Sequence, residues 1–319
     1  MPEFFQSVVQ SDVTPSADGV TTIDIQIRPT SHLLITIKAL NASVKGTTAA
    51  ILGALETIEV LQFGATIVSI SALDLYALNC VLLGHEPHQE NVVDTDNAVR
   101  HLTLAVPFGR RLYDPTECFP AVRSGELQLQ LTWDIADTGY DGVIEQVQQV
   151  ELPGANPSRF LTYKTKNYTP SATGDADVDL NIGNTLAGIM FWGTTVPTGT
   201  AWTTTLNQLT LLKDNTEAYF SKCHWETLHG QLVERVSPAN AFAEKFHTEN
   251  TAGSYAQNAD TAAEEQDDST ISNHAYMDLS PRNVDDYLLD TVGLSSLKLT
   301  VNAGDTNASR IIPVELQRV

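Results

Sequence analysis

The chain has 319 residues and carries 39 acidic against 18 basic side chains, a formal net charge of −21. A protein that contacts a genome directly needs a basic surface that displaces phosphate counterions, so this charge argues against nucleic-acid binding. The 42% share of hydrophobic residues is typical of a folded chain, and the length suffices for two domains with separate cores.

Three cysteines, Cys80, Cys118 and Cys223, are odd in number and widely spaced. This pattern matches neither a zinc knuckle nor a redox pair, so we expect reduced thiols. The N-terminus lacks the basic start and apolar run of a signal peptide. Both features predict synthesis in a reducing cytoplasm.

Alternating apolar and polar residues dominate the first half of the chain, as in half-buried β-strands. The clearest example is the Leu-Gln-Leu-Gln-Leu-Thr-Trp run at 127–133. The expected strands of this half are 23–27, 33–37, 55–61, 65–70, 101–106 and 127–133. One segment, 71–83, has apolar residues at helical spacing and a capping Ser71 followed by Asp74.

The second half repeats this plan in the same order. Its expected strands are 178–182, 189–192, 206–212, 275–279 and 297–301, and its expected helix is 217–236. The apolar positions of the strands at 23–27, 55–61 and 127–133 have counterparts in the second half. Ordered matches that include a helix at the same place indicate a structural repeat.

The repeat divides the chain into two expected domains, 1–152 and 153–319, joined through a Pro- and Gly-containing linker at 151–158. The second copy is longer between its helix and its next strand. This extra segment, 237–272, is polar and poor in large apolar residues, which predicts a surface projection.

The tandem plan resembles the double jelly-roll major capsid proteins of tailless, usually membrane-containing icosahedral bacteriophages. The resemblance rests on the repeat, the helix inside each copy, the Leu-Ala-Val-Pro-Phe-Gly-Arg segment at 104–110 and the longer polar loop of the second copy. It implies an all-β fold of two tandem eight-stranded jelly-roll sandwiches, each with a short flanking helix. It implies no enzymatic activity, no catalytic residues and no cofactor.

The resemblance also implies a biological setting. Homotrimers with a pseudo-hexagonal outline would tile an icosahedral virion shell, after synthesis in the host cytoplasm. The partners would be other copies of the chain, with minor capsid proteins and an internal membrane as further candidates. The 237–272 loop would form an outward tower.

Two groups of residues are candidate sites. His85, His88, Asp94 and Asp96 have metal-binding side chains, but they lie in an expected polar loop, so a solvated loop is favoured over a metal site. Phe4 and Phe5 precede the first expected strand. They either anchor an arm on a neighbouring subunit or a membrane, or pack on their own domain.

The alternative function is a jelly-roll carbohydrate-binding or glycan-processing protein. Such a protein needs aromatic side chains that stack on sugars, for which Trp202 and Trp225 are candidates, and paired carboxylates in a cleft. The sequence contains no G-x-S-x-G elbow and no phosphate-binding loop.

Overall fold

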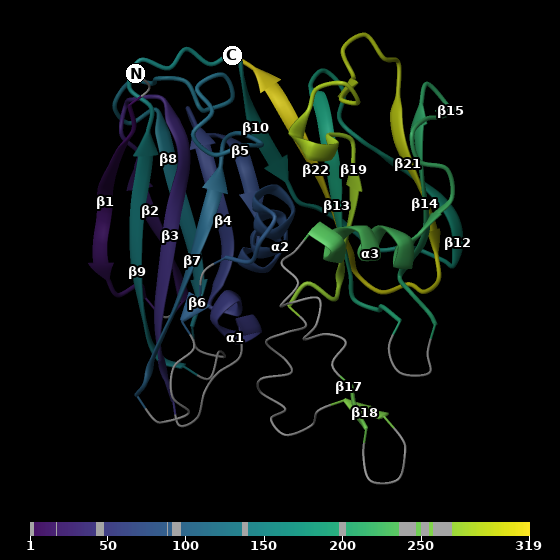
Figure 1. Cartoon of the computed structure of the whole chain (residues 1–319), viewed down its shortest axis with the longest axis horizontal. Helices are drawn as coiled ribbons and strands as arrows, with labels where there is room; N and C mark the ends of the chain where they lie inside the picture. Colours follow the sequence, from purple (N-terminus) through teal and green to yellow (C-terminus); the bar gives the residue numbers. More distant parts are fainter. Residues whose placement is uncertain are drawn as a thin grey trace. The chain divides into compact units, whose positions relative to one another are not determined.

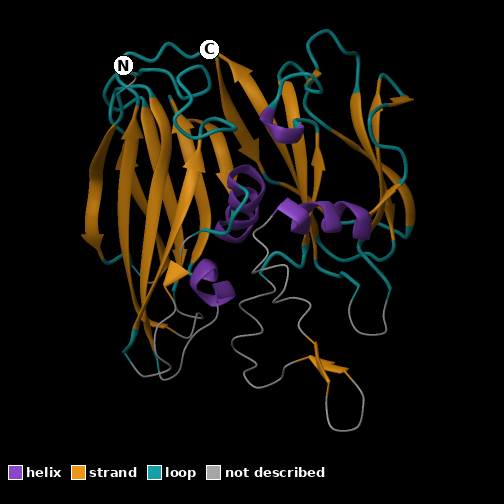
Figure 2. Cartoon of the chain, in the orientation of Figure 1, coloured by secondary structure: helices purple, strands orange, loops and turns teal. Residues whose placement is uncertain are grey.

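The computed structural model describes residues 3–16, 18–42, 48–87, 89–90, 97–135, 140–197, 202–235, 247–249, 255–257 and 270–319. The chain divides into two compact units. The first comprises Met1–Asn156 with Val233–Ile271, and the second comprises Pro157–Leu232 with Ser272–Val319. Both are built mainly of β-strands (Figures 1 and 2).

The first unit is a sandwich of two antiparallel sheets. One sheet has the order β1-β9-β3-β7-β6, and the other contains β5-β4-β8-β2. The strands are β1 (Phe5–Val13), β2 (Asp18–Asp24), β3 (Thr30–Asn41), β4 (Leu55–Gln62), β5 (Ala65–Ile70), β6 (Gln89–Glu90), β7 (Val99–Pro107), β8 (Leu127–Asp134) and β9 (Tyr140–Glu151). A separate hairpin joins β17 (His247–Glu249) to β18 (Tyr255–Gln257).

Period-two alternation gives the two sheets their shared core. On β3, Leu33, Ile35 and Ile37 are fully buried, while the residues between them are half-buried. On β8, Leu127, Leu129 and Leu131 face the same core from the opposite sheet, because alternate side chains point to one face. The alternation read from the sequence is therefore the pattern that closes the sandwich.

Helix α2 (Ala72–Leu83) follows β5 in the chain and matches the expected helix. The Ser71 hydroxyl accepts a hydrogen bond from the backbone N–H of Asp74 at 3.1 Å, as a capping residue does. Gly84 ends the helix with φ at 73°, which glycine adopts without strain. The Asn79 side chain bonds both backbone groups of Ala105 on β7 at 2.8 Å, which fixes the helix to the sheet.

The second unit has the same two-sheet plan. One sheet contains β10-β22-β13-β19 and the other has the order β12-β21-β14-β15. The strands are β10 (Arg159–Lys164), β11 (Lys166–Tyr168), β12 (Gly174–Asp179), β13 (Thr185–Gly193), β14 (Leu206–Lys213), β15 (Thr216–Glu217), β16 (Cys223–His224), β19 (His274–Asp278), β20 (Leu289–Asp290), β21 (Leu297–Ala303) and β22 (Ser309–Arg318). Its helices are α3 (Trp225–Arg235) and the short η1 (Pro281–Asn283).

Strand order confirms the double jelly roll. In each unit the last strand lies between the first strand and the third long strand and pairs with both. Strand β9 lies between β1 and β3, and β22 lies between β10 and β13. In the other sheet, the second strand of each unit pairs with the strand that precedes the last: β2 pairs with β8, and β12 pairs with β21. In each copy the helix follows the strand hairpin that begins with β4 or β14, so the repeat read from the sequence is a repeat of topology.

Three local expectations are wrong. The second helix begins at Trp225 rather than 217, because Asp214, Asn215 and Tyr219 have positive φ and form turns around short strands. A helix that the sequence did not predict, α1 (Thr48–Gly53), precedes β4. The first strand is β1, so Phe5 lies within a strand rather than before it. Most of the 237–272 loop lies outside the described residues.

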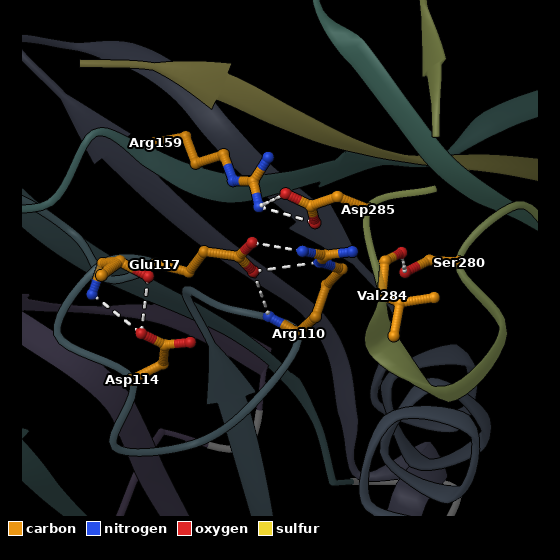
Figure 3. A network of polar contacts seen from close by, with 8 residues as sticks. Arg110, Asp114, Glu117, Arg159, Ser280, Val284 and Asp285 are labelled. Atoms are coloured by element: carbon orange, nitrogen blue, oxygen red, sulfur yellow. Dashed lines mark hydrogen bonds and ion pairs between the residues drawn. The ribbon is translucent and has the colours of Figure 1, made fainter. Parts of the chain in front are cut away.

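The segment after β7 contains a buried ion pair (Figure 3). The Arg110 guanidinium donates to both carboxylate oxygens of Glu117, at 3.0 Å from Nε to Oε2, and both side chains are about 5% exposed or less. Gly109 is required here because a Cβ atom would lie 2.1 Å from the Glu117 carbonyl oxygen. The Phe-Gly-Arg part of the 104–110 segment thus builds a close-packed loop.

Within the second unit, Arg159 binds the Asp285 carboxylate through two hydrogen bonds of 2.8 and 2.7 Å (Figure 3). The Ser280 hydroxyl donates to the Val284 carbonyl at 3.2 Å in the same loop. These contacts fasten the segment between β19 and β20 to the first strand of its own unit.

Replacing Glu117 with Gln should destabilise the first unit by about 3 kcal/mol, because it removes the charge of a carboxylate that is bound by the buried Arg110 guanidinium. Arg123→Gln is the control, since Arg123 is 92% exposed and pairs with Glu126 at 3.9 Å. That change should cost less than about 1 kcal/mol. Urea unfolding followed by tryptophan fluorescence measures both, and equal losses would contradict the role of the buried pair.

Candidate assembly surface

Phe4 and Phe5 lie where β1 begins, near the N-terminus marked in Figure 1. The Phe4 ring lies edge-on to Tyr113, with ring centroids 5.2 Å apart. Arg28 lies over the Phe5 ring at 5.9 Å from its centroid. Despite these contacts Phe4 is 60% exposed and Phe5 is 53% exposed. Both rings are therefore held on their own domain and still present apolar surface to another molecule.

Carboxylates beside β1 are matched by cations. Arg28 Nη1 lies 3.3 Å from Glu151 Oε2, and the Ser7 hydroxyl donates to the same carboxylate at 3.4 Å. Further along the strand, Lys38 Nζ lies 2.5 Å from Asp12 Oδ1. Each of these two pairs is neutral overall, in a chain with a net charge of −21.

A buried histidine supports the aromatic corner. The His32 ring lies edge-on to Tyr113 at 5.2 Å, and its Nδ1 lies 3.0 Å from the Ser31 hydroxyl. That hydroxyl also accepts a hydrogen bond from the Tyr113 backbone N–H at 2.8 Å. Burial lowers the pKa of His32 to about 4, so the ring is neutral near pH 7. It therefore packs beneath the corner without adding charge.

Strand β1 is the edge of its sheet and is largely exposed along its length. Its pairing with β9 shifts register on either side of Gln10, and Asp12 has φ at 44°. The Gln10 side chain donates to Glu145, which is fully buried. Burial raises the pKa of Glu145 above its ordinary value. At these irregularities the polar Gln10 side chain of the edge strand turns toward the buried Glu145.

Of the four candidate metal ligands, His85 is the one that the structure describes. His85 is exposed, and its Nδ1 lies 2.8 Å from the Glu86 carbonyl oxygen. His88, Asp94 and Asp96 lie outside the described residues. Among the residues that the structure describes, no three His, Cys, Asp or Glu side chains are arranged to hold a metal ion.

The residues considered for sugar stacking also separate. Trp225 is 1% exposed and belongs to the core of the second unit, so it cannot stack on a ligand. Trp202 is exposed. A cavity of about 100 Å³ in the second unit is lined by Lys164 and Glu315, among other polar residues. Its lining contains one carboxylate, whereas the usual glycosidase mechanism uses two.

No pattern in the sequence predicts a role for His32, Tyr113 or the outward face of β1. His32 lies in a strand, and Tyr113 is far away in a loop. Only the fold brings them into contact. Phe4 and Phe5 could be found because adjacent aromatics near a terminus are unusual, but their partners could not.

His32 should make stability depend on pH. Because its folded pKa is lower than its unfolded value, the unfolded chain binds more protons between pH 6.5 and 4, so stability falls as pH falls through that range. His32→Gln should reduce the loss between pH 7 and 4.5 by about 2 to 3 kcal/mol. Urea midpoints across pH test this, and parallel curves for both proteins would contradict it.

No protein-family model matches the sequence, and no curated protein matches it. Solved structures do match the fold. The major capsid protein P2 from bacteriophage PM2 aligns with a TM-score of 0.63 at 11% identity, covering 100% of this chain and 98% of that one. The STIV MCP gives 0.66 at 12% identity, covering 98% and 96%. The PBCV-1 virus capsid gives 0.60 at 8% identity, covering 99% and 94%.

These similarities span nearly the whole of each chain, and both jelly rolls are included in them. At this level of identity they establish the fold. The chain therefore has the double jelly-roll fold found in viral major capsid proteins.

Proposed function

We propose that this chain is a major capsid protein that forms homotrimers and tiles an icosahedral virion shell. The observation that carries the proposal is the repeated jelly roll, two copies of one strand order in a single chain, matched end to end by viral capsid proteins. We assign one jelly roll to residues 1–152 and the other to residues 153–319.

The geometry supports this role because a trimer of such chains contains six similar sandwiches. Six similar units in a ring approximate a hexagon, and hexagons pack side by side in a facet. Closed symmetry repeats each contact, so contacts that are individually weak can hold a shell together. The function is structural and needs no catalytic residue.

Charge sets the conditions for assembly. Each copy carries −21, so copies repel one another at low ionic strength, and salt screens this repulsion. The same charge disfavours direct contact with a genome. We propose the virion as the location and other copies as the main partners, with minor capsid proteins and an internal membrane as further partners.

The described part of the chain contains no helix long and apolar enough to cross a membrane.

The purified chain should be a trimer in solution. Light scattering coupled to size exclusion should give a mass near three times 34.7 kDa. The trimer fraction should increase from low to high salt, because screening weakens the repulsion between acidic copies. A monomer at both salt concentrations would contradict the proposal, and a glycan array with hits would then favour the sugar-binding alternative.

A further inference from the structure

The two jelly rolls differ in how the outward face of one sheet is buried. In the second unit, Met190 on β13 pairs with Ile312 on β22, and both are fully buried. Their neighbours Phe191 and Ile311 belong to the core of that sandwich, so Met190 and Ile312 point to the opposite face. Around this pair the sheet is therefore buried on both faces.

On the equivalent strands of the first unit, Thr36 on β3 pairs with Gln146 on β9. These residues also alternate with core residues, since Ile35, Ile37 and Val147 are fully buried. Thr36 and Gln146 themselves are only half-buried. Around these pairs, the face that is fully buried in the second unit is thus only half-buried in the first, whereas His32 and Val150 further along it are buried.

The first strands show the same difference. Strand β10 of the second unit is buried from Phe160 to Tyr163, whereas β1 has no buried residue. Val8 is 54% exposed and pairs with Gln148, on the outward side of the sheet. We call this surface the β1 face, defined by Gln6, Val8, Leu34, Thr36, Gln146 and Gln148.

We propose that the β1 face is where a second copy of this chain docks. The inference rests on the proposed function, because a ring of similar jelly rolls gives each copy of the fold a similar environment. The face that is buried in the second unit would then be buried in the first unit by the next chain of the trimer.

Charge singles out this face for contact between acidic copies. All six side chains that define it are uncharged, and the adjacent Asp12 is paired with Lys38 at 2.5 Å. Like charges brought together at an interface cost several kcal/mol, so two chains of net charge −21 approach best through a neutral surface. The six side chains of the β1 face are thus uncharged, the apolar Val8 among them is exposed, and the equivalent face of the second unit is buried around Met190.

The register shifts along β1 indicate how the partner binds. A regular edge strand can pair with a strand of another chain, whereas bulges disturb the row of backbone groups that such pairing requires. The second copy should therefore pack its side chains on the β1 face rather than extend the sheet.

The test introduces a carboxylate on the β1 face. Val8→Glu adds a charge at an exposed site, and Gln146→Glu adds one with almost no change of shape. Each should raise the protein concentration needed for half-maximal trimer formation at least about tenfold, because the charge is desolvated and repelled by the next acidic chain. Phe63→Glu is the control, at a 70% exposed residue in the turn between β4 and β5.

Sedimentation velocity measures assembly, and thermal unfolding shows that each variant is folded. Trimer formation unchanged in both variants, with a trimeric wild type, would overturn the docking surface and leave the proposed function intact. A wild type that stays monomeric would overturn both. If Val8→Glu fails to fold, trimer formation by Gln146→Glu decides whether the β1 face is the docking surface. Equal loss of assembly in Phe63→Glu would also overturn the inference, since the effect would then follow from net charge.

Discussion

The fold of each unit depends on the pairing of its last strand with strands that lie far away in the sequence. The last strand of each unit lies between its first and third strands, as β9 does between β1 and β3. Without that strand, β3 would lose the neighbour that covers one edge, and β1 would have no place in the sheet. Because β9 pairs with both neighbours, it places β1 beside the rest of its sheet.

The two copies of the fold meet different requirements. In the second unit the sheet containing β13 and β22 has buried apolar residues on both faces around Met190 and Ile312. In the first unit the equivalent sheet alternates between an apolar core face and a half-buried outer face, where Thr36 and Gln146 lie near Leu34 and Lys38. A half-buried, mainly polar face can be solvated in a single chain and can still be buried by a neighbour, which suits the assembly proposed for this chain.

Regular alternation made part of the fold predictable. The 127–133 run became β8 (Leu127–Asp134), and the capped 71–83 segment became α2. The edge strand β1 was missed because its Gln- and Ser-rich sequence has no buried face to impose a period. The closing strands β9 and β22 were missed too. Buried polar residues such as Glu145 and Gln149 interrupt the pattern of β9.

The candidate surface was only partly predictable for a related reason. Phe4 and Phe5 stand out in the sequence, but His32, Tyr113 and the β1 face become neighbours only through strand order, which local patterns do not encode. The face differs from its equivalent in the second unit in the burial of paired residues such as Thr36 and Gln146, which depends on the folded structure.

Electron microscopy of the purified, assembled protein tests the central claim most directly. Averaged views along the symmetry axis should show six lobes in a hexagonal outline, alternating between two slightly different kinds because each chain supplies two jelly rolls. Particles of two lobes, or rings with another number of lobes, would contradict the account of this chain as a trimeric building block of a shell.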